Sequence, residues 1–235
     1  MSSYKGHTVF AIILGLLFFQ NPISLALTLI GASLPDFDHD VKKNNVFTQI
    51  ITGLVIFGIF YFLKLPYFIG IMICLLAMIF YFSSHRGFTH SIFGIAILTI
   101  LISLIIIIES LIILSFNLNS VAISEKIAIG IIVLFFGVFS LNKRFILPFI
   151  FLFVISLLFL QNYPFDYRMI IFPLFLGFLS HLILDSFTPA GLKIFEPFSS
   201  KKVHKNFGVA LIILLGLLAI PQIIELLKLI WIIIY

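Results

Sequence analysis

The chain contains very few charged residues, and this scarcity excludes most soluble folds. Only 10% of its 235 residues are Asp, Glu, Lys or Arg, while 62% are hydrophobic, and the mean hydropathy is +1.28. Soluble domains carry roughly 25% charged residues. Because so little polar surface is available to cover a water-soluble globule, we expect an integral membrane protein.

Cysteine and long polar segments are also nearly absent. The single cysteine, Cys74, excludes a disulfide within the chain. No polar stretch is long enough for a soluble domain, and no repeat of fixed period is evident, so we expect residues 1–235 to form one integral-membrane domain. The first apolar segment lacks an Ala-x-Ala-like cleavage site and is expected to remain in the mature protein.

Apolar runs separated by short polar breaks recur along the whole chain. About 20 helical residues cross the roughly 30 Å hydrocarbon core, so the sequence predicts an all-α fold, a polytopic transmembrane bundle of about eight to nine segments. The predicted helices cover residues 7–19, 22–34, 46–63, 66–83, 90–115, 122–140, 144–161, 168–186 and 207–234. The first two form either a short hairpin turning at Asn21-Pro22 or one kinked crossing, and Pro221 leaves open whether the last segment folds back.

The basic residues favour the hairpin. With the N-terminus inside, ten of them fall on one side of the membrane and three on the other, as the positive-inside rule predicts, whereas a kinked first crossing would scramble this asymmetry. The inner group is Lys5, Lys42, Lys43, Arg86, Lys143, Arg144, Lys193, Lys201, Lys202 and Lys205, and the outer group is Lys64, Lys126 and Arg168. The net charge of +5 then reflects orientation in a multi-pass inner (cytoplasmic) membrane protein and contact with membrane lipids, and no nucleic-acid partner is expected.

Four polar motifs fall at the predicted cytoplasmic ends of these helices. They are "GHT" (6–8), "PDFDHD" (35–40), "SHRGFTHS" (84–91) and "SHLILDSFTPAG" (180–191), and together they hold five of the six histidines and four of the nine acidic residues. Ionisable groups are costly in a membrane protein, so their gathering on one face predicts a functional site that faces the cytoplasm.

The acidic motif requires a cation. Asp36, Asp38 and Asp40 cannot all remain ionised at close range without one, because like charges repel. His and Asp ligands without cysteine suit a divalent metal, with zinc as the first expectation and manganese or iron as alternatives. Asp40 has an equal claim to be only the cap of the following helix.

The histidines extend this predicted metal site. His181 and Asp185 stand one helical turn apart, at i and i+4, so both can reach one ion or two adjacent ions. His85 and His90 bracket a turn at Gly87. His204, in a lysine-rich loop, is expected to be solvated beside lipid headgroups.

Arg86 and Thr89 predict an anion site beside the metal. A helix that begins near Thr89 offers free backbone N–H groups and a positive dipole end, and the fork of Arg86 matches phosphate oxygens. Metal and anion sites together predict hydrolysis of a small-molecule or lipid phosphoester by a metal-activated water, with Asp38 or Asp40 as general base.

Other motifs with similar letters do not fit. An EF-hand loop would need glycine at Val41 and glutamate at Phe47, and no H-E-x-x-H is present. The spacing of His181 and Asp185 occurs in acid-phosphatase-like lipid phosphatases, but that motif needs an arginine where Phe175 stands.

A divalent-cation or proton transporter or channel is the alternative function. Transport sites lie near the membrane midplane with relays toward both faces. Here the polar groups lie at helix ends on one side, and the opposite half holds little beyond Glu109, Glu125 and Asp166. This distribution favours the hydrolase.

The motifs "GHT", "LPDFDHD", "HRGFTHS" and "HLILDSFTPAG…FEPF" resemble those of the YdjM-type inner-membrane proteins of bacteria and archaea, which are usually described as membrane-bound metal-dependent hydrolases. The resemblance spans residues 5 to about 200, and "HRGFTHS" is its most specific part. It implies a site made of His7, Asp36, Asp38, His39, His85, Arg86, His90, His181 and Asp185. It also implies a distant relationship to zinc-dependent phospholipase C enzymes, and hence a phosphodiester substrate.

Overall fold

The computed structural model describes residues 4–38, 43–64, 67–83, 87–115, 125–158 and 166–234. Regular structure in these ranges is helical, apart from an isolated bridge between Leu192 and Val203. The elements are α1 (Tyr4–Phe18), α2 (Pro22–Ser33), the 3₁₀-helix η1 (Pro35–Asp38), α3 (Lys43–Phe62), α4 (Phe68–Phe82), the 3₁₀-helix η3 (Phe88–His90), α5 (Ile92–Ser115), α6 (Glu125–Ser140), α7 (Lys143–Leu158), α8 (Arg168–Ser186) and α9 (Lys205–Ile234). The all-α prediction is confirmed.

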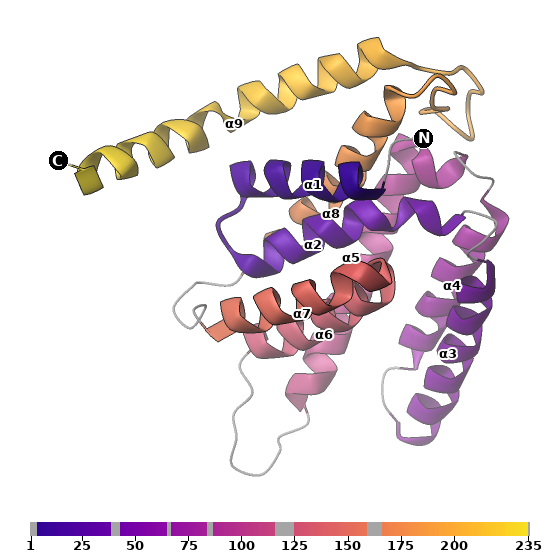
Figure 1. The fold of residues 1–235 in the computed structure, drawn as a ribbon. Helices are drawn as coiled ribbons and strands as arrows, with labels where there is room; N and C mark the ends of the chain where they lie inside the picture. The colour runs from indigo at the N-terminus through magenta and orange to yellow at the C-terminus, as the bar shows by residue number, and fades with distance from the viewer. Residues whose placement is uncertain are drawn as a thin grey trace.

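The first two helices form the predicted hairpin and not a kinked crossing. α1 and α2 lie side by side (Figure 1). The side-chain oxygen of Asn21 accepts a hydrogen bond of 2.7 Å from the backbone N–H of Ser24, which caps α2, and Pro22 occupies its first turn. Both are strong signals for a helix start, and they explain why the chain reverses here.

The buried helix α8 packs against α1, α2, α5 and α9. Its closest neighbour is α2, because two glycines let the backbones meet. A Cβ atom on Gly177 would collide with the carbonyl oxygen of Thr28, and one on Gly31 would collide with that of Leu174. The side chains of Leu27 and Phe178 are fully buried in the same core. This close crossing brings the end of α2 beside the last two turns of α8.

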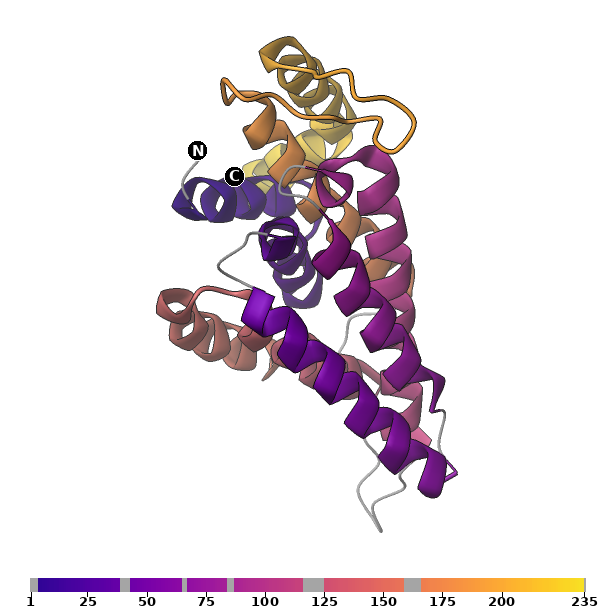
Figure 2. The same cartoon turned by 90° about the vertical axis from the view of Figure 1, so that its right-hand side faces the viewer.

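The remaining helices surround this centre. α3 and α4 pack together as a pair that extends away from the α1–α2 hairpin (Figures 1 and 2). α5 packs against α4, α6 and α8, and α7 packs against α6 and α2. α9 contacts α8 and α1 and then extends beyond the rest of the protein (Figure 1).

Three helices among the described residues are long and apolar enough to cross a membrane. They are Ile92–Leu114 within α5, Arg168–Ser186, which is α8, and Lys205–Glu225 within α9. Four shorter apolar helices accompany them: Tyr4–Phe18, Pro22–Ser33, Val46–Phe62 and Phe68–Phe82. α9 continues through Pro221 without a break, so the last segment does not fold back.

The starts of α1 and α5, the end of α2, the α6–α7 turn and the α8–α9 connection lie at one end of the protein. The Tyr4 hydroxyl lies 3.4 Å from Ser33 Oγ and accepts a hydrogen bond from the backbone N–H of Asn142, which joins the start of α1, the end of α2 and the α6–α7 turn. The N–H of Ile92 donates to the carbonyl of Ile194 and joins the start of α5 to the α8–α9 connection. The described basic residues on these segments are Lys5, Lys143, Arg144, Lys193, Lys201, Lys202 and Lys205.

Candidate metal centre

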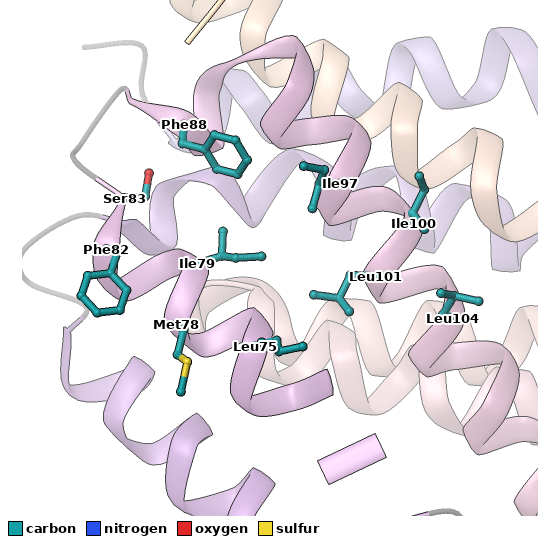
Figure 3. Close-up of a pocket in the computed structure, with 10 residues that line it drawn as sticks. All are labelled: Leu75, Met78, Ile79, Phe82, Ser83, Phe88, Ile97, Ile100, Leu101 and Leu104. Carbon is teal, nitrogen blue, oxygen red and sulfur yellow. The ribbon is translucent and has the colours of Figure 1, made fainter. Parts of the chain in front are cut away.

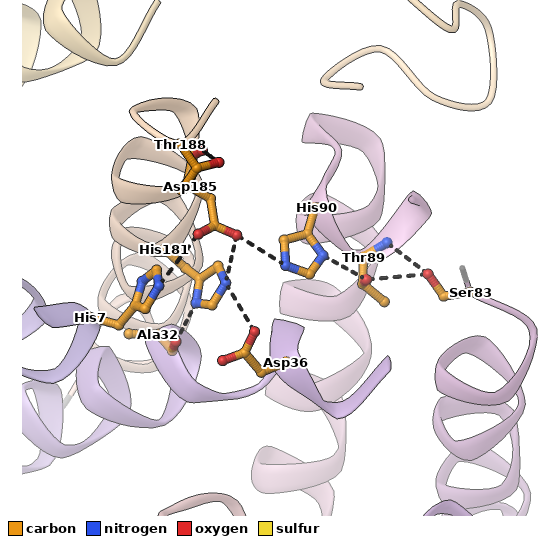
Figure 4. A network of polar contacts seen from close by, with 9 residues as sticks. All are labelled: His7, Ala32, Asp36, Ser83, Thr89, His90, His181, Asp185 and Thr188. Atoms are coloured by element: carbon orange, nitrogen blue, oxygen red, sulfur yellow. Dashed lines mark hydrogen bonds and ion pairs between the residues drawn. The ribbon is translucent and has the colours of Figure 1, made fainter. Parts of the chain in front are cut away.

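Five ionisable side chains from four elements meet at this end of the protein. His7 comes from α1, Asp36 from η1, His90 from η3, and His181 and Asp185 from α8 (Figure 4). The three histidines and Asp185 are buried, whereas 32% of the Asp36 side chain is exposed. Solvent therefore reaches the cluster at Asp36, and the two side chains from α8 are shielded from it.

Asp185 lies among the three histidines. Its Oδ1 is 3.5 Å from Nε2 of His7, and its Oδ2 is 3.5 Å from Nε2 of His181 and 3.6 Å from Nε2 of His90. These distances are longer than good hydrogen bonds, which cluster near 2.9 Å. They are close to the separation of about 3.3 Å between ligand atoms that each lie roughly 2.0–2.1 Å from one tetrahedral ion.

His181 is oriented for binding through Nε2. Its Nδ1 donates a hydrogen bond of 2.7 Å to the carbonyl oxygen of Ala32, so in the neutral ring the lone pair is on Nε2. That atom is buried and makes no hydrogen bond within the described part of the chain. It lies 3.6 Å from Oδ1 of Asp36 as well as close to Asp185. A backbone carbonyl that fixes the tautomer of a histidine is the usual support for a metal ligand.

His90 is oriented by a chain of hydroxyl groups. Its Nδ1 lies 3.1 Å from Oγ1 of Thr89, and Oγ1 of Thr89 lies 3.2 Å from Oγ of Ser83. Nε2 of His90 consequently faces Asp185 (Figure 4). Thr89 is therefore a positioning residue for His90, and Ser83 at the end of α4 supports it.

The histidines fit a cation better than a set of plain ion pairs. The rings of His7 and His181 are stacked, with centroids 4.0 Å apart and planes 13° apart. Two protonated rings at that separation would repel each other in a buried place. Neutral imidazoles with carboxylates are the form in which these side chains bind a metal.

Two overlapping ligand sets result. In one set, ligand atoms of His7, His181 and Asp185 lie within 4.8 Å of one another, and in the other set those of Asp36, His90 and His181 do. Because Nε2 of His181 belongs to both sets and can bind one ion only, the two sets overlap at a single ion. A second ion would have to be bridged to the first by a carboxylate. Nitrogen and oxygen donors without sulfur are compatible with zinc, manganese or iron.

The structure gathers five of the eight residues that the sequence predicts as metal ligands, namely His7, Asp36, His90, His181 and Asp185. The backbone of Asp38 belongs to η1, but its side chain lies outside the described part of the chain. His39, Asp40, His85 and Arg86 also lie outside the described residues.

The anion cradle predicted at the start of α5 is wrong in one respect, because four of the backbone N–H groups there are already bonded. Thr89 N donates to Ser83 Oγ, and Ser91 N donates to the Phe88 carbonyl. Ile92 N donates to the Ile194 carbonyl, and Ser91 Oγ caps α5 by accepting from Gly94 N. These groups are not available to a phosphate.

Sequence patterns alone do not point to the residues that assemble the cluster. Gly31 and Gly177 allow α2 and α8 to approach, and the carbonyl of Ala32 then reaches His181. One signal was present: Gly177 stands one helical turn before His181, so a small residue and a candidate ligand share a helix face.

The fold and the cluster define an all-helical protein with membrane-spanning helices and a buried histidine–carboxylate centre. The model of the YdjM inner membrane protein family matches residues 1–141 and 145–235. The chain belongs to this family. No curated protein and no solved structure matches the chain.

Proposed function

We propose that the protein is a membrane-bound metal-dependent hydrolase that cleaves a phosphoester, in a lipid or a lipid-linked molecule. The observation that carries this proposal is the Nε2 atom of His181, which is buried, oriented by Ala32, and placed between the carboxylates of Asp36 and Asp185. A buried acceptor nitrogen held between two carboxylates is stabilised by a cation.

The five gathered side chains would hold the metal, with zinc first and manganese or iron as alternatives. A divalent ion bound there supplies Lewis acidity and lowers the pKa of a bound water. His181 and His90 are held in place by Ala32 and Thr89, and Asp36 is the member that solvent and substrate reach. Asp38 and Asp40, which follow Asp36 in the sequence, remain candidates for the general base.

Elemental analysis of the purified protein beside a phosphoester hydrolysis screen tests this function. We expect a bound divalent metal at one or two equivalents, and hydrolysis that stops when the metal is chelated. A metal-containing protein that hydrolyses none of a broad set of phosphoesters, yet moves the metal across proteoliposomes, would replace the hydrolase with a transporter.

A divalent-cation or proton transporter is the second candidate, and buried polar groups along α5 favour it. Thr99 and Ser103 are buried, and Glu109 lines a separate pocket of about 290 Å³ with Gln49 and Thr52. Glu109 lies about 25 Å along α5 from Ile92, at a rise of 1.5 Å per residue. Hydroxyls bonded to their own helix are also ordinary packing in membranes, and Thr99 donates to the Ile95 carbonyl in this way.

Arg86 is proposed to bind the phosphate of the substrate. Since lysine offers a point charge where arginine offers a fork, Arg86→Lys should leave the metal content unchanged and lower phosphoester turnover by at least tenfold. Metal analysis and kcat of the same preparation measure the two effects. Loss of the metal in Arg86→Lys would make Arg86 a structural residue instead.

We further propose a multi-pass topology in which the metal centre faces the cytoplasm. The gathering of Lys5, Lys143 and Lys201 at the end that holds the cluster supports it. Arg168, from the predicted outer group, lies at the opposite end from the cluster. It begins α8, where the carbonyl of Met169 accepts a hydrogen bond from Ser24 near the start of α2, and the cluster lies at the other end of both helices. This charge distribution agrees with the positive-inside rule.

Cysteine accessibility tests the topology. In a Cys74→Ser background, Lys143→Cys and Lys201→Cys should react with a membrane-impermeant reagent only after the membrane is opened, because both positions face the cytoplasm. Lys64→Cys and Lys126→Cys should react in closed spheroplasts. If positions 143 and 201 respond differently from each other, the shared cytoplasmic face is wrong.

A further inference from the structure

A groove between α4 and α5 ends close to the metal centre. Its volume is about 630 Å³, within the range of roughly 300–1,000 Å³ typical of ligand pockets. Leu75, Ile79 and Phe82 line it from α4, and Ile97, Leu101 and Leu104 line it from α5 (Figure 3). The two rows of side chains face each other across the groove.

The groove is apolar along its length and has one polar end. Among the described residues that line it, Ser83 alone has a polar side chain, and it follows directly after the last residue of α4. Its Oγ contacts Thr89, and Thr89 contacts Nδ1 of His90. One side chain therefore separates the polar end of the groove from a candidate metal ligand. An amphiphile has the same arrangement, with a polar group at one end and a hydrocarbon chain behind it.

The groove opens sideways, toward the space that lipid occupies around a membrane protein. At its rim, 80% of Phe82 and 58% of Ile100 are exposed, whereas Ile79 and Leu101 are half-buried. From Leu75 to Ser83 the groove follows about 12 Å of helix, at a rise of 1.5 Å per residue. That length is close to the depth of one bilayer leaflet, about 15 Å of hydrocarbon.

We infer that the groove binds a hydrocarbon chain of the substrate. The substrate is then a lipid phosphoester, with its phosphate at the histidine–carboxylate cluster and one chain between α4 and α5, and it enters from the membrane without crossing water. The identity of the head group rests on the proposed function. The binding of a hydrocarbon chain rests on the groove alone.

Photo-crosslinking tests chain binding without any need for activity. The protein is reconstituted in nanodiscs that contain a phospholipid with a diazirine on its acyl chain, and labelled peptides are mapped by mass spectrometry. We expect labelling to concentrate on the peptides that carry Leu75 and Leu104. Leu101→Trp fills the groove and should lower this labelling at least fivefold. Leu147→Trp is the matched control, because 77% of Leu147 is exposed on α7, outside the groove.

Chain-length dependence tests whether the groove serves the substrate. Leu101→Trp should lower hydrolysis of a long-chain phospholipid at least tenfold and leave hydrolysis of bis(p-nitrophenyl) phosphate unchanged, with unchanged metal content. Ile100→Trp, at the exposed rim, provides a second variant if Leu101→Trp does not fold.

The outcomes separate the two proposals. Labelling at the groove by a wild-type protein that hydrolyses neither compound refutes the proposed function and supports the groove. Labelling that is equal in Leu101→Trp and Leu147→Trp refutes the groove, as does an equal loss of both hydrolytic activities in Leu101→Trp. A disulfide between two copies of an Ile100→Cys variant, in a Cys74→Ser background, also refutes it, because a second copy of the chain would then occupy the groove.

Discussion

Replacing His181 or Asp185 with alanine is expected to remove the bound metal and the heat stability that it provides. His181 belongs to both sets of ligand atoms, and Asp185 faces all three histidines, so either substitution removes a central ligand of the cluster. A metal present at 100 times its dissociation constant stabilises the folded protein by about 2.7 kcal/mol. Chelation should therefore lower the melting temperature of the wild type and leave that of either variant unchanged.

The dependence on chelator separates metal loss from simple cavity formation, because a cavity destabilises the protein equally with and without metal. Elemental analysis and thermal unfolding with and without EDTA provide both measurements. His204→Ala is the matched control, since His204 is an exposed histidine. Added zinc should restore the chelated wild type and neither variant. Full metal content and unchanged EDTA sensitivity in His181→Ala and Asp185→Ala would show that the cluster is not a metal site.

Gly177→Ala is expected to be the second most damaging substitution, although it adds only one methyl group and removes no candidate ligand. Its Cβ atom would collide with the backbone of Thr28 in α2, and backbone cannot move aside as a flexible side chain can. Overpacking of this kind costs about 1–3 kcal/mol of unfolding free energy. Separation of the helices would also draw the Ala32 carbonyl away from His181, and loss of such a support lowers metal affinity about 10–100-fold.

Gly216→Ala provides the matched comparison for this prediction. Gly216 lies in α9 with nothing within 4 Å of the added atom, so the variant should be as stable as the wild type or gain up to about 1 kcal/mol from helix propensity. Thermal unfolding and zinc titration of both variants measure the difference. A Gly177→Ala protein with wild-type stability and metal affinity would mean that the close crossing of α2 and α8 does not control the site.

The sequence predicts the secondary structure well because membrane helices depend on local properties. The run from Ile92 to Leu114 is apolar at nearly every position, and such a run forms a helix in lipid regardless of its neighbours. Asn21 and Pro22 likewise signal a chain reversal through their own backbone preferences. Pro221 is the exception. Proline often interrupts a helix, so the sequence did not decide whether the last segment folds back at Pro221, whereas α9 is continuous there.

The candidate ligands could be recognised from the sequence because ionisable residues are so rare in this chain. Their grouping at one end follows from helix length and alternating direction, so His7, Asp36, His90 and the His181–Asp185 pair fall at the same end once the hairpin is accepted. The expected role of Thr89 was wrong in its detail. The backbone N–H groups beside it are bonded to Ser83, Phe88 and Ile194, and the last of these partners is about 100 residues away in the sequence.

The sequence by itself therefore determined the membrane character, the helices and the residue types that a metal centre needs, because hydropathy and ligand chemistry are properties of single residues and short segments. Only the tertiary structure decided which side chains share the centre and how they point. Three features depend on how closely two helices approach each other. They are the lack of room for a side chain at Gly31 and Gly177, the hydrogen bond from His181 to Ala32, and the groove that ends at Ser83. That distance is set by the packing of both surfaces at once, so no single segment of the sequence contains it.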